Sequence, residues 1–390
     1  MLDVFPFSDI KASDYSLLRQ KLKKCQYNTQ SFLQYKLNPH KFNPFGLVML
    51  PLRLEKETET TILILLFFVG KTLERKKIQK VFTNHEIQRL IAMKVLSSTS
   101  ATQIKSNVMI IPYRIYYFIS DFKYRKEESY RRRVLKYDGV YSVSQDSIDL
   151  YEATIKRKVT KTLDLCTGSG VQSILASSYS KSVVAIDINE RAIQFTLFNI
   201  QLNNVNNVTC MTSDIYDKLT GQKFDLILAN PPSEISFKKS SAYRDGGLQG
   251  TTVLEKILKG LPYVLKSSGL CEIVTKLPNL SNLPRHKFFY QCLNQGNYKI
   301  RYLEFTRTDM FQNIINDIFW NGSMNGLKNI KSDIKKLVYL YKKNKIKNIG
   351  YGILKIRAAK KYSYKEKTFT NAIKLPTTTR SQIEEMMREA

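Results

Sequence analysis

Cysteine and histidine are scarce in this chain, and their spacing fits neither a disulfide framework nor a metal site. Five cysteines and three histidines are scattered over 390 residues, with no Cys-x-x-Cys pair. Structural zinc needs closely spaced thiolate and imidazole ligands, and an odd number of dispersed cysteines is typical of reduced thiols. We therefore expect a cytoplasmic protein that holds no metal.

Long hydrophobic runs are also missing. The longest one, Ile62–Val69, is far shorter than the roughly 20 residues that cross a bilayer. The N-terminus carries Asp3 and lacks the basic-then-apolar order of a signal peptide. We expect neither a signal peptide nor an association with membranes.

Acidic residues are few beside basic ones, with 62 Lys and Arg against 33 Asp and Glu and a formal net charge of +29. Residues 1–135 carry 24 basic and 11 acidic side chains and residues 301–390 carry 19 and 8, whereas residues 136–300 carry 19 and 14. Basic flanks can follow the phosphates of a nucleic acid or an acidic partner. Abundant lysine can equally well just solvate a surface, and the sequence leaves both interpretations open.

The N-terminal 135 residues predict a basic module of their own. Residues 61–120 show three helical segments, the last opened by a capping box at Thr83. The strand-like run Val108–Phe118 follows them. This order predicts a winged-helix-like α+β module.

Such a module can bind nucleic acid, form a homodimer or cover a substrate. Its third helix, expected over Asn84–Leu96, offers only Arg89 and Lys94 as basic residues, which is little for reading a DNA groove. Dimerisation or substrate cover is therefore favoured over nucleic-acid binding.

Strands and helices alternate over residues 136–360, which indicates a parallel sheet with crossover helices. The charged segment Lys123–Arg133 marks the boundary before this domain. The connection 306–348 is long enough for a lid or a substrate wall, and residues 361–390 predict a polar tail that ends in a helix, Thr379–Arg388. Seven strands are expected: Thr162–Leu165, Ser182–Ile186, Val208–Thr212, Phe224–Leu228, Leu270–Val274, Lys299–Phe305 and Gly350–Ile356. The fold class is α/β, with a doubly wound, Rossmann-like sheet.

A glycine turn follows the first of these strands, in Asp164-Leu-Cys-Thr-Gly-Ser-Gly170. Gly168 and Gly170 lack Cβ atoms, so backbone N–H groups can approach a ligand closely. Asp187 ends the second strand 19 residues after Gly168, and an acidic residue at that place can accept hydrogen bonds from ribose hydroxyls. Asp187 can also cap the helix that begins near Asn189.

Together these segments resemble motif I and the following strand tips of class I S-adenosylmethionine (SAM)-dependent methyltransferases. The resemblance implies SAM as cofactor, held by the turn residues Cys166, Thr167, Gly168, Ser169 and Gly170. It implies that Asp164 faces the methionine ammonium and that Asp214 accepts the adenine amino group. Ile188 and Ile215 would then enclose the adenine ring. The segment Tyr141–Ser147 weakly resembles one that folds over the cofactor in related enzymes, where proline is usual.

The fourth strand ends in Asn230-Pro231-Pro232-Ser233. This resembles the Asn-Pro-Pro-aromatic motif of enzymes that methylate an amino or amide nitrogen. Such a nitrogen is a poor nucleophile because its lone pair is delocalised. The Asn230 side-chain oxygen and the Pro231 carbonyl can each accept a hydrogen bond from one N–H of this nitrogen. These hydrogen bonds raise the electron density on the nitrogen and align it for methyl transfer. Pro232 helps to fix the backbone. Asn230 would also lie beside the cofactor.

The segment Arg244-Asp-Gly-Gly247 resembles the HemK-like branch of glutamine methyltransferases within the small-methyltransferase family. The resemblance covers about residues 137–305. Ser233 departs from it, because an aromatic residue usually stacks on the acceptor there. Phe237 or Tyr243 is a candidate replacement, and Trp320 in the long connection is a further candidate for contact with the substrate.

The sequence predicts methyl transfer to an amide or amino nitrogen of a protein side chain or small molecule. The main alternative is a base amino group of RNA or DNA, which the basic flanks favour and Ser233 disfavours. O-methylation and a non-catalytic SAM-binding regulator are the remaining alternatives.

Overall fold

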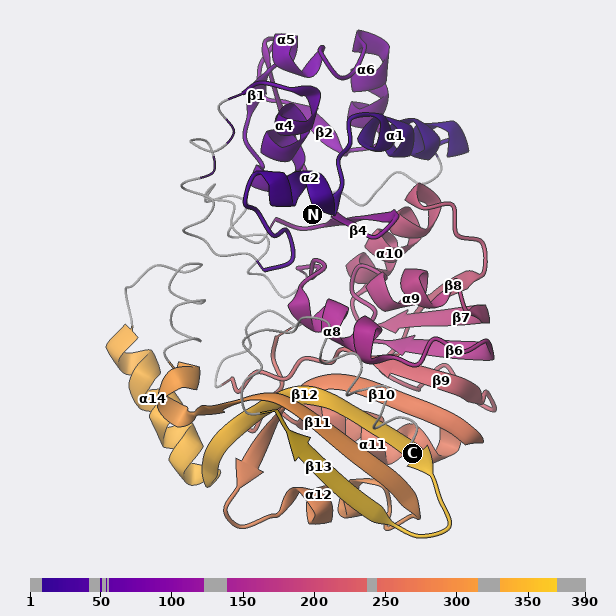
Figure 1. The fold of residues 1–390 in the computed structure, drawn as a ribbon, viewed down its shortest axis with the longest axis vertical. Coiled ribbons are helices and arrows are strands. Elements are labelled where there is room, and N and C mark those ends of the chain that lie inside the picture. Colours follow the sequence, from indigo (N-terminus) through magenta and orange to yellow (C-terminus); the bar gives the residue numbers. More distant parts are fainter. Residues whose placement is uncertain are drawn as a thin grey trace.

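A computed structural model describes residues 9–41, 50, 54, 56–122, 139–236, 244–314 and 330–369, with only the backbone given for 330–333. Figure 1 shows a large twisted sheet below a smaller N-terminal module, and the two parts are in direct contact. No described helix is long and apolar enough to cross a membrane. The predicted boundary at Lys123–Arg133 and the predicted helix Thr379–Arg388 lie outside the described residues.

The large sheet has eight strands in the order β13-β11-β12-β10-β9-β6-β7-β8. β8, β7, β6, β9 and β10 run parallel, whereas β12 lies antiparallel between β10 and β11. The strands are β6 Val159–Leu165, β7 Ser180–Asp187, β8 Val208–Thr212, β9 Phe224–Ala229, β10 Leu265–Leu280, β11 Tyr298–Asp309, β12 Ile346–Ala358 and β13 Ser363–Thr368. All seven predicted strands are confirmed, and the sheet is of the Rossmann-like, doubly wound kind.

Helices cover both faces of this sheet (Figure 1). On one side lie α8 (Gln145–Ala153), α9 (Val171–Ala176) and α10 (Glu190–Leu202), and on the other α11 (Thr252–Val264) and α12 (Arg285–Cys292). Near-continuous apolar strands such as Phe224–Ala229 follow from burial on both faces.

The predicted polar tail is wrong at its start, because residues 363–368 form β13, which pairs in parallel with β11. Its sequence, SYKEKT, is polar and mostly exposed. An edge strand with one covered face needs few apolar residues, so its hydrophobic pattern gives little sign of a strand. The sheet therefore extends beyond residue 360.

The N-terminal module begins with α1 (Ala12–Lys24) and α2 (Thr29–Gln34). A three-stranded sheet of order β1-β3-β2 follows, interleaved with helices. Its elements are α4 Glu59–Leu63, η2 Ile64–Val69, β1 Leu73–Glu74, α5 Arg75–Ile78, α6 Asn84–Ala92, β2 Leu96–Ser98 and β3 Gln103–Ser106. The capping box is confirmed, since Thr83 Oγ1 accepts from Glu86 N and Glu86 accepts from Thr83 N. The winged-helix-like character stays a prediction.

The strand-like run Val108–Phe118 forms an antiparallel hairpin that continues to Ser120. β4 (Met109–Tyr113) and β5 (Tyr116–Ser120) pair antiparallel and are not part of the three-stranded sheet. Arg114 takes a positive φ of 54° at the reversal.

Two asparagines of α10 attach this hairpin to the domain that contains the large sheet. The side-chain amide of Asn199 accepts from Ile119 N (2.8 Å) and donates to Ile119 O (3.0 Å). Asn203 does the same with Tyr117, at 2.9 and 2.7 Å. Four residues of a helix rise about 6 Å and two residues of a strand span about 6.8 Å, so the two spacings match. The module and the helices α9 and α10 share one apolar core.

Candidate active site

The turn after β6 contains three residues with positive φ: Cys166 (57°), Gly168 (57°) and Gly170 (80°). The two glycines are needed for different reasons. A Cβ on Gly168 would meet no atom within 4 Å, so this position lies open toward the cavity. A Cβ on Gly170 would lie 2.7 Å from Thr196 Cγ2 of α10. Gly168 thus leaves room for a ligand, and Gly170 allows helix packing.

Asp164 is buried at the end of β6. One oxygen, Oδ2, accepts hydrogen bonds from Thr167 Oγ1 (2.6 Å), Ser173 N (2.9 Å) and Ser173 Oγ (2.6 Å). No described group donates to the other oxygen, Oδ1. Burial raises the pKa of this carboxyl to about 6, against the lowering effect of these hydrogen bonds. A nearby cation would stabilise its charged form.

Asp187 ends β7 and connects two segments of the site. Its Oδ2 accepts from Gly168 N and its Oδ1 from Asn189 N, both at 2.9 Å. Burial raises its pKa, and these backbone hydrogen bonds oppose the increase. Asn189, not Asp187, caps α10 with its side chain. Ile188 is 65% exposed beside it and lines the cavity.

Asp214 and Ile215 follow β8. Asp214 Oδ2 is 2.8 Å from Lys256 Nζ in an exposed ion pair, which contributes little to stability. Ile215 adopts a positive φ of 49°, a strained conformation for a β-branched residue. Strain of this kind tends to be found at functional sites.

Asn230 follows β9, and its side-chain nitrogen donates to Asp146 Oδ2 at 3.1 Å. Asp146 lies in the first turn of α8, and its other oxygen accepts from Ser144 Oγ and from Ser147 N. An ionised carboxylate can only accept hydrogen bonds. Asn230 must therefore present its nitrogen to Asp146, and its oxygen Oδ1 is left for another partner.

The residues at these strand tips line one cavity of about 810 Å³. Of the predicted residues that the structure describes, all except Gly170 line it: Asp164, Cys166, Thr167, Gly168, Ser169, Asp187, Ile188, Asp214, Ile215, Asn230, Pro231, Pro232 and Ser233. The segment Tyr141–Ser147 contributes six further lining residues. Phe237, Tyr243 and Trp320 lie outside the described residues.

Some cavity residues were not found from the sequence. Glu234 directly follows Ser233, and its carboxylate pairs with Arg244 (2.5 Å) and Lys276 (3.5 Å). These cations lower its pKa against the effect of burial. Tyr351 donates to Asp149 at 2.6 Å. These contacts join residues far apart in the chain, so no local pattern indicates them.

The described parts of the connection 306–348 form another wall. Helix α14 (Ile330–Lys343) brings Leu337 and Tyr341 to the cavity. They pack with Ile235 and Ile314 in a small apolar cluster. The wall beyond Asn230 is therefore largely apolar.

The methyltransferase small domain family matches residues 132–298. A putative protein N5-glutamine methyltransferase of Methanocaldococcus jannaschii is 35% identical over 143 residues, which are 35% of this chain and 71% of that protein. The chain belongs to this family of class I SAM-dependent methyltransferases. It is a SAM-dependent methyltransferase that transfers a methyl group to an acceptor substrate.

Other relatives are matched over shorter stretches. The ribosomal protein uL3 glutamine methyltransferase of Xanthomonas campestris is 33% identical over 30% of this chain and 42% of its own length. The release factor glutamine methyltransferase of Fusobacterium nucleatum is 44% identical over 18% and 21%. The chain thus spans less than half of these two relatives. A methyltransferase structure from Pyrococcus furiosus aligns with a TM-score of 0.35 at 16% identity, over 56% of this chain and 85% of that one.

The cavity offers polar groups that suit SAM. Three buried side-chain oxygens that line it, Ser142 Oγ, Ser169 Oγ and Gln172 Oε1, have no hydrogen-bond partner among the described residues. Buried polar atoms are rarely left without a partner. With the open space at Gly168, they fit a bound polar ligand of SAM's size.

Proposed function

We propose that this enzyme methylates the side-chain amide nitrogen of a glutamine in a protein acceptor. The observation that carries the proposal is the fixed orientation of Asn230 by Asp146. Relatives named for glutamine methylation of a ribosomal protein and of a release factor support the acceptor class.

The cofactor would lie along the strand tips. The unbonded oxygen of Asp164 is available to the methionine ammonium, and Asp187 to the ribose hydroxyls. Ile188 and Ile215 would enclose the adenine, and Asp214 would accept its amino group in place of Lys256. When bound, SAM supplies an electrophilic methyl group and leaves as S-adenosylhomocysteine.

The chain's own residues prepare the acceptor nitrogen. Asn230 Oδ1 and the Pro231 carbonyl each accept one N–H of the glutamine amide, which raises electron density on the nitrogen and fixes its direction. The nitrogen would take up the methyl group that SAM supplies and would release one proton to solvent. Both acceptors are preorganised, so little reorientation is needed during the reaction.

The acceptor side of the cavity fits a polypeptide better than a flipped base. Its apolar wall includes Ile235, Leu337 and Tyr341, which can contact side chains around a glutamine. Ser233 stands where an aromatic residue would stack on a base. Methylation of a nucleic-acid base is therefore the alternative that the following experiment distinguishes.

The test is incubation with methyl-labelled SAM and cell extract, followed by separation of protein, RNA, DNA and small molecules. We expect label in protein, released as methylamine by acid hydrolysis, because hydrolysis of an N-methyl amide yields methylamine. Label in nucleic acid would support the alternative instead, and methanol released by mild base would indicate O-methylation. The variant Asn230→Ala serves as the matched control.

A further inference from the structure

Asn313, which lines the cavity, has its hydrogen-bond donors engaged within the protein. Its side-chain nitrogen donates to Thr308 Oγ1 (2.6 Å), Thr308 O (3.1 Å) and Asp309 O (2.8 Å). No described group donates to its side-chain oxygen, Oδ1. The donors of an asparagine side chain are all on its nitrogen, so the part of Asn313 that is left for a ligand is a hydrogen-bond acceptor.

Tyr351 of β12 also lines the cavity and has the same character. Its hydroxyl donates to Asp149 Oδ2 at 2.6 Å, and the other oxygen of Asp149 accepts from Gln145 at 2.7 Å. Burial, followed by the charge of Asp149, raises the pKa of Tyr351 well above its ordinary value. The phenol therefore keeps its single proton, which Asp149 holds, and the phenolic oxygen can only accept from a ligand.

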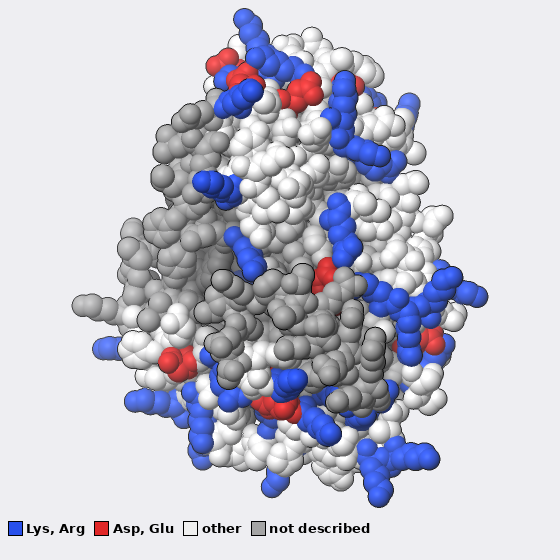
Figure 2. Space-filling model, in the orientation of Figure 1, with Lys and Arg blue, Asp and Glu red and all other residues white. Residues whose placement is uncertain are grey.

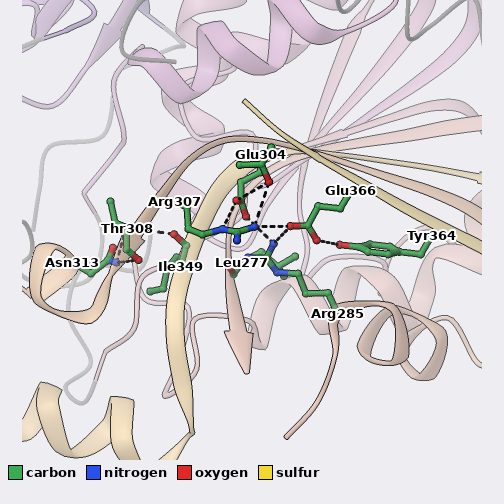
Figure 3. Close-up of polar contacts among 10 residues, drawn as sticks. Leu277, Arg285, Glu304, Arg307, Thr308, Asn313, Ile349, Tyr364 and Glu366 are labelled. Carbon is green, nitrogen blue, oxygen red and sulfur yellow. Dashed lines mark hydrogen bonds and ion pairs between the residues drawn. The ribbon is translucent and has the colours of Figure 1, made fainter. Parts of the chain in front are cut away.

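These two residues belong to one wall of the cavity. Thr308, which holds Asn313, donates to Ile349 O of β12 at 3.4 Å. Figure 3 shows Asn313, Thr308 and Ile349 side by side. Tyr351 lies two residues after Ile349 on the same strand, so both side chains point to the same side of the sheet.

Strand order separates this wall from the residues expected to hold SAM. Those residues follow β6, β7 and β8, whereas Tyr351 lies on β12, on the other side of β9 in the sheet. Asn230 follows β9, between the two groups. The wall with Asn313 and Tyr351 is therefore the part of the cavity that is left for the acceptor.

The strands that carry this wall are held by an ion-pair network. Arg285 reaches Glu304 of β11 (2.7 Å) and donates to Leu277 O of β10 (2.8 Å). Arg307, next to Thr308 in the sequence, also reaches Glu304, at 2.6 Å (Figure 3). The oxygens of the wall are thus fixed in place, and fixed groups lose little freedom when a ligand binds.

The two cations beside the Asn-Pro-Pro segment are already paired. Arg244 and Lys276 both contact Glu234, at 2.5 and 3.5 Å. The Lys and Arg side chains of the described residues are otherwise spread over the face of the molecule that Figure 2 shows. A wall of oxygen acceptors with paired cations suits a ligand that donates N–H groups better than one that brings phosphates.

We propose that Asn313 Oδ1 and the Tyr351 hydroxyl oxygen bind the main chain of the acceptor polypeptide, each by accepting one backbone N–H beside the methylated glutamine. This inference rests on the proposed function and adds a binding subsite to it. A polypeptide presents backbone N–H groups whatever its side chains are, whereas a phosphodiester backbone has none. The two residues position the acceptor and do not touch the reacting nitrogen, so they should affect KM more than kcat.

The test uses the intact acceptor protein, identified by mass spectrometry in extract that the enzyme has labelled with methyl-SAM. In Asn313→Ala and in Tyr351→Phe we expect the KM for this protein to rise about tenfold, as for one lost hydrogen bond between buried groups. The kcat and the Kd for SAM should stay within a few-fold of wild type. The controls Asn206→Ala and Tyr263→Phe change exposed residues outside the cavity and should leave KM unchanged.

A second measurement changes the acceptor instead of the enzyme, and so separates a direct contact from a structural effect. An α-hydroxy acid in place of a residue near the glutamine replaces one backbone N–H by an ester oxygen. With the wild-type enzyme, this replacement should raise KM about tenfold at two positions. Each of these positions should lose its sensitivity in one of the two variants.

Three results would overturn the inference. KM is unchanged in both variants, the wild-type enzyme is insensitive to every ester, or the esters have the same effect on the wild type and on both variants. Label in protein together with any of these results refutes the inference alone. Label that enters no protein refutes the proposed function, and this inference with it.

Discussion

The side-chain nitrogen of Asn230 donates to Asp146 Oδ2 at 3.1 Å, across 84 residues of sequence. This contact leaves only the asparagine oxygen to face an acceptor. Asp146 is a positioning residue in this account, since it acts through Asn230.

Replacing Asp146 with Asn should impair catalysis more than cofactor binding. An asparagine can donate as well as accept, so the amide of Asn230 is free to turn its nitrogen toward the acceptor. We expect kcat to fall on the order of tenfold to hundredfold, with the Kd for SAM within a few-fold of wild type. Asp146→Glu keeps the acceptor and should recover part of the rate. An unchanged kcat in Asp146→Asn would remove the positioning role.

The two glycines of the turn should respond differently to alanine. In Gly168→Ala only the left-handed conformation is penalised, by about 1–2 kcal/mol, and the loss should be mainly in SAM affinity. Gly170→Ala adds overpacking against Thr196 of about 1–3 kcal/mol. Urea unfolding and SAM titration measure both effects. Thr196→Ser removes the clashing methyl group and should partly rescue Gly170→Ala. Without such rescue, the packing explanation is wrong.

Asp164 should make SAM binding depend on pH near 6. Its pKa is about 6 in the folded protein against an ordinary value of 3.8, so the folded state binds more protons between these values. The stability of the free enzyme should therefore decrease as pH rises through this window. SAM affinity should increase over the same range, because an ionised carboxylate attracts the ammonium. Asp164→Asn should abolish both trends, as measured by unfolding and titration at pH 5 and 7.5. Unchanged trends in that variant would assign them to another group.

Asn199 should stabilise the N-terminal module and the glycine turn together. Its side-chain nitrogen donates to Ser169 O (2.8 Å) as well as to Ile119 O. Asn199→Ala leaves buried backbone groups unpaired, at a cost of about 1–3 kcal/mol, and should also weaken SAM binding. Gln201→Ala, at an exposed position of the same helix, is the control. Equal losses in both variants would contradict a specific role for the hairpin contact.

Local patterns predicted most of the large sheet and the residues at the strand tips that line the cavity. β8 has the expected bounds, Val208–Thr212, because alternating strands and helices are visible in sequence. Asp146 was missed as a partner of Asn230 because their contact depends on how α8 packs over the sheet. β13 was missed because an exposed edge strand such as Ser363–Thr368 lacks an apolar pattern. Tertiary contacts and edge strands are thus the features that the sequence predicts least well.

Activation of the acceptor nitrogen by Asn230 is most directly tested by single-turnover methyl transfer with Asn230→Ala at saturating SAM. The labelled protein acceptor serves as substrate, and SAM binding is measured in parallel by calorimetry. We expect transfer to slow on the order of a hundredfold, while SAM still binds within a few-fold of its wild-type Kd. Transfer at the wild-type rate, with SAM bound, would contradict the account.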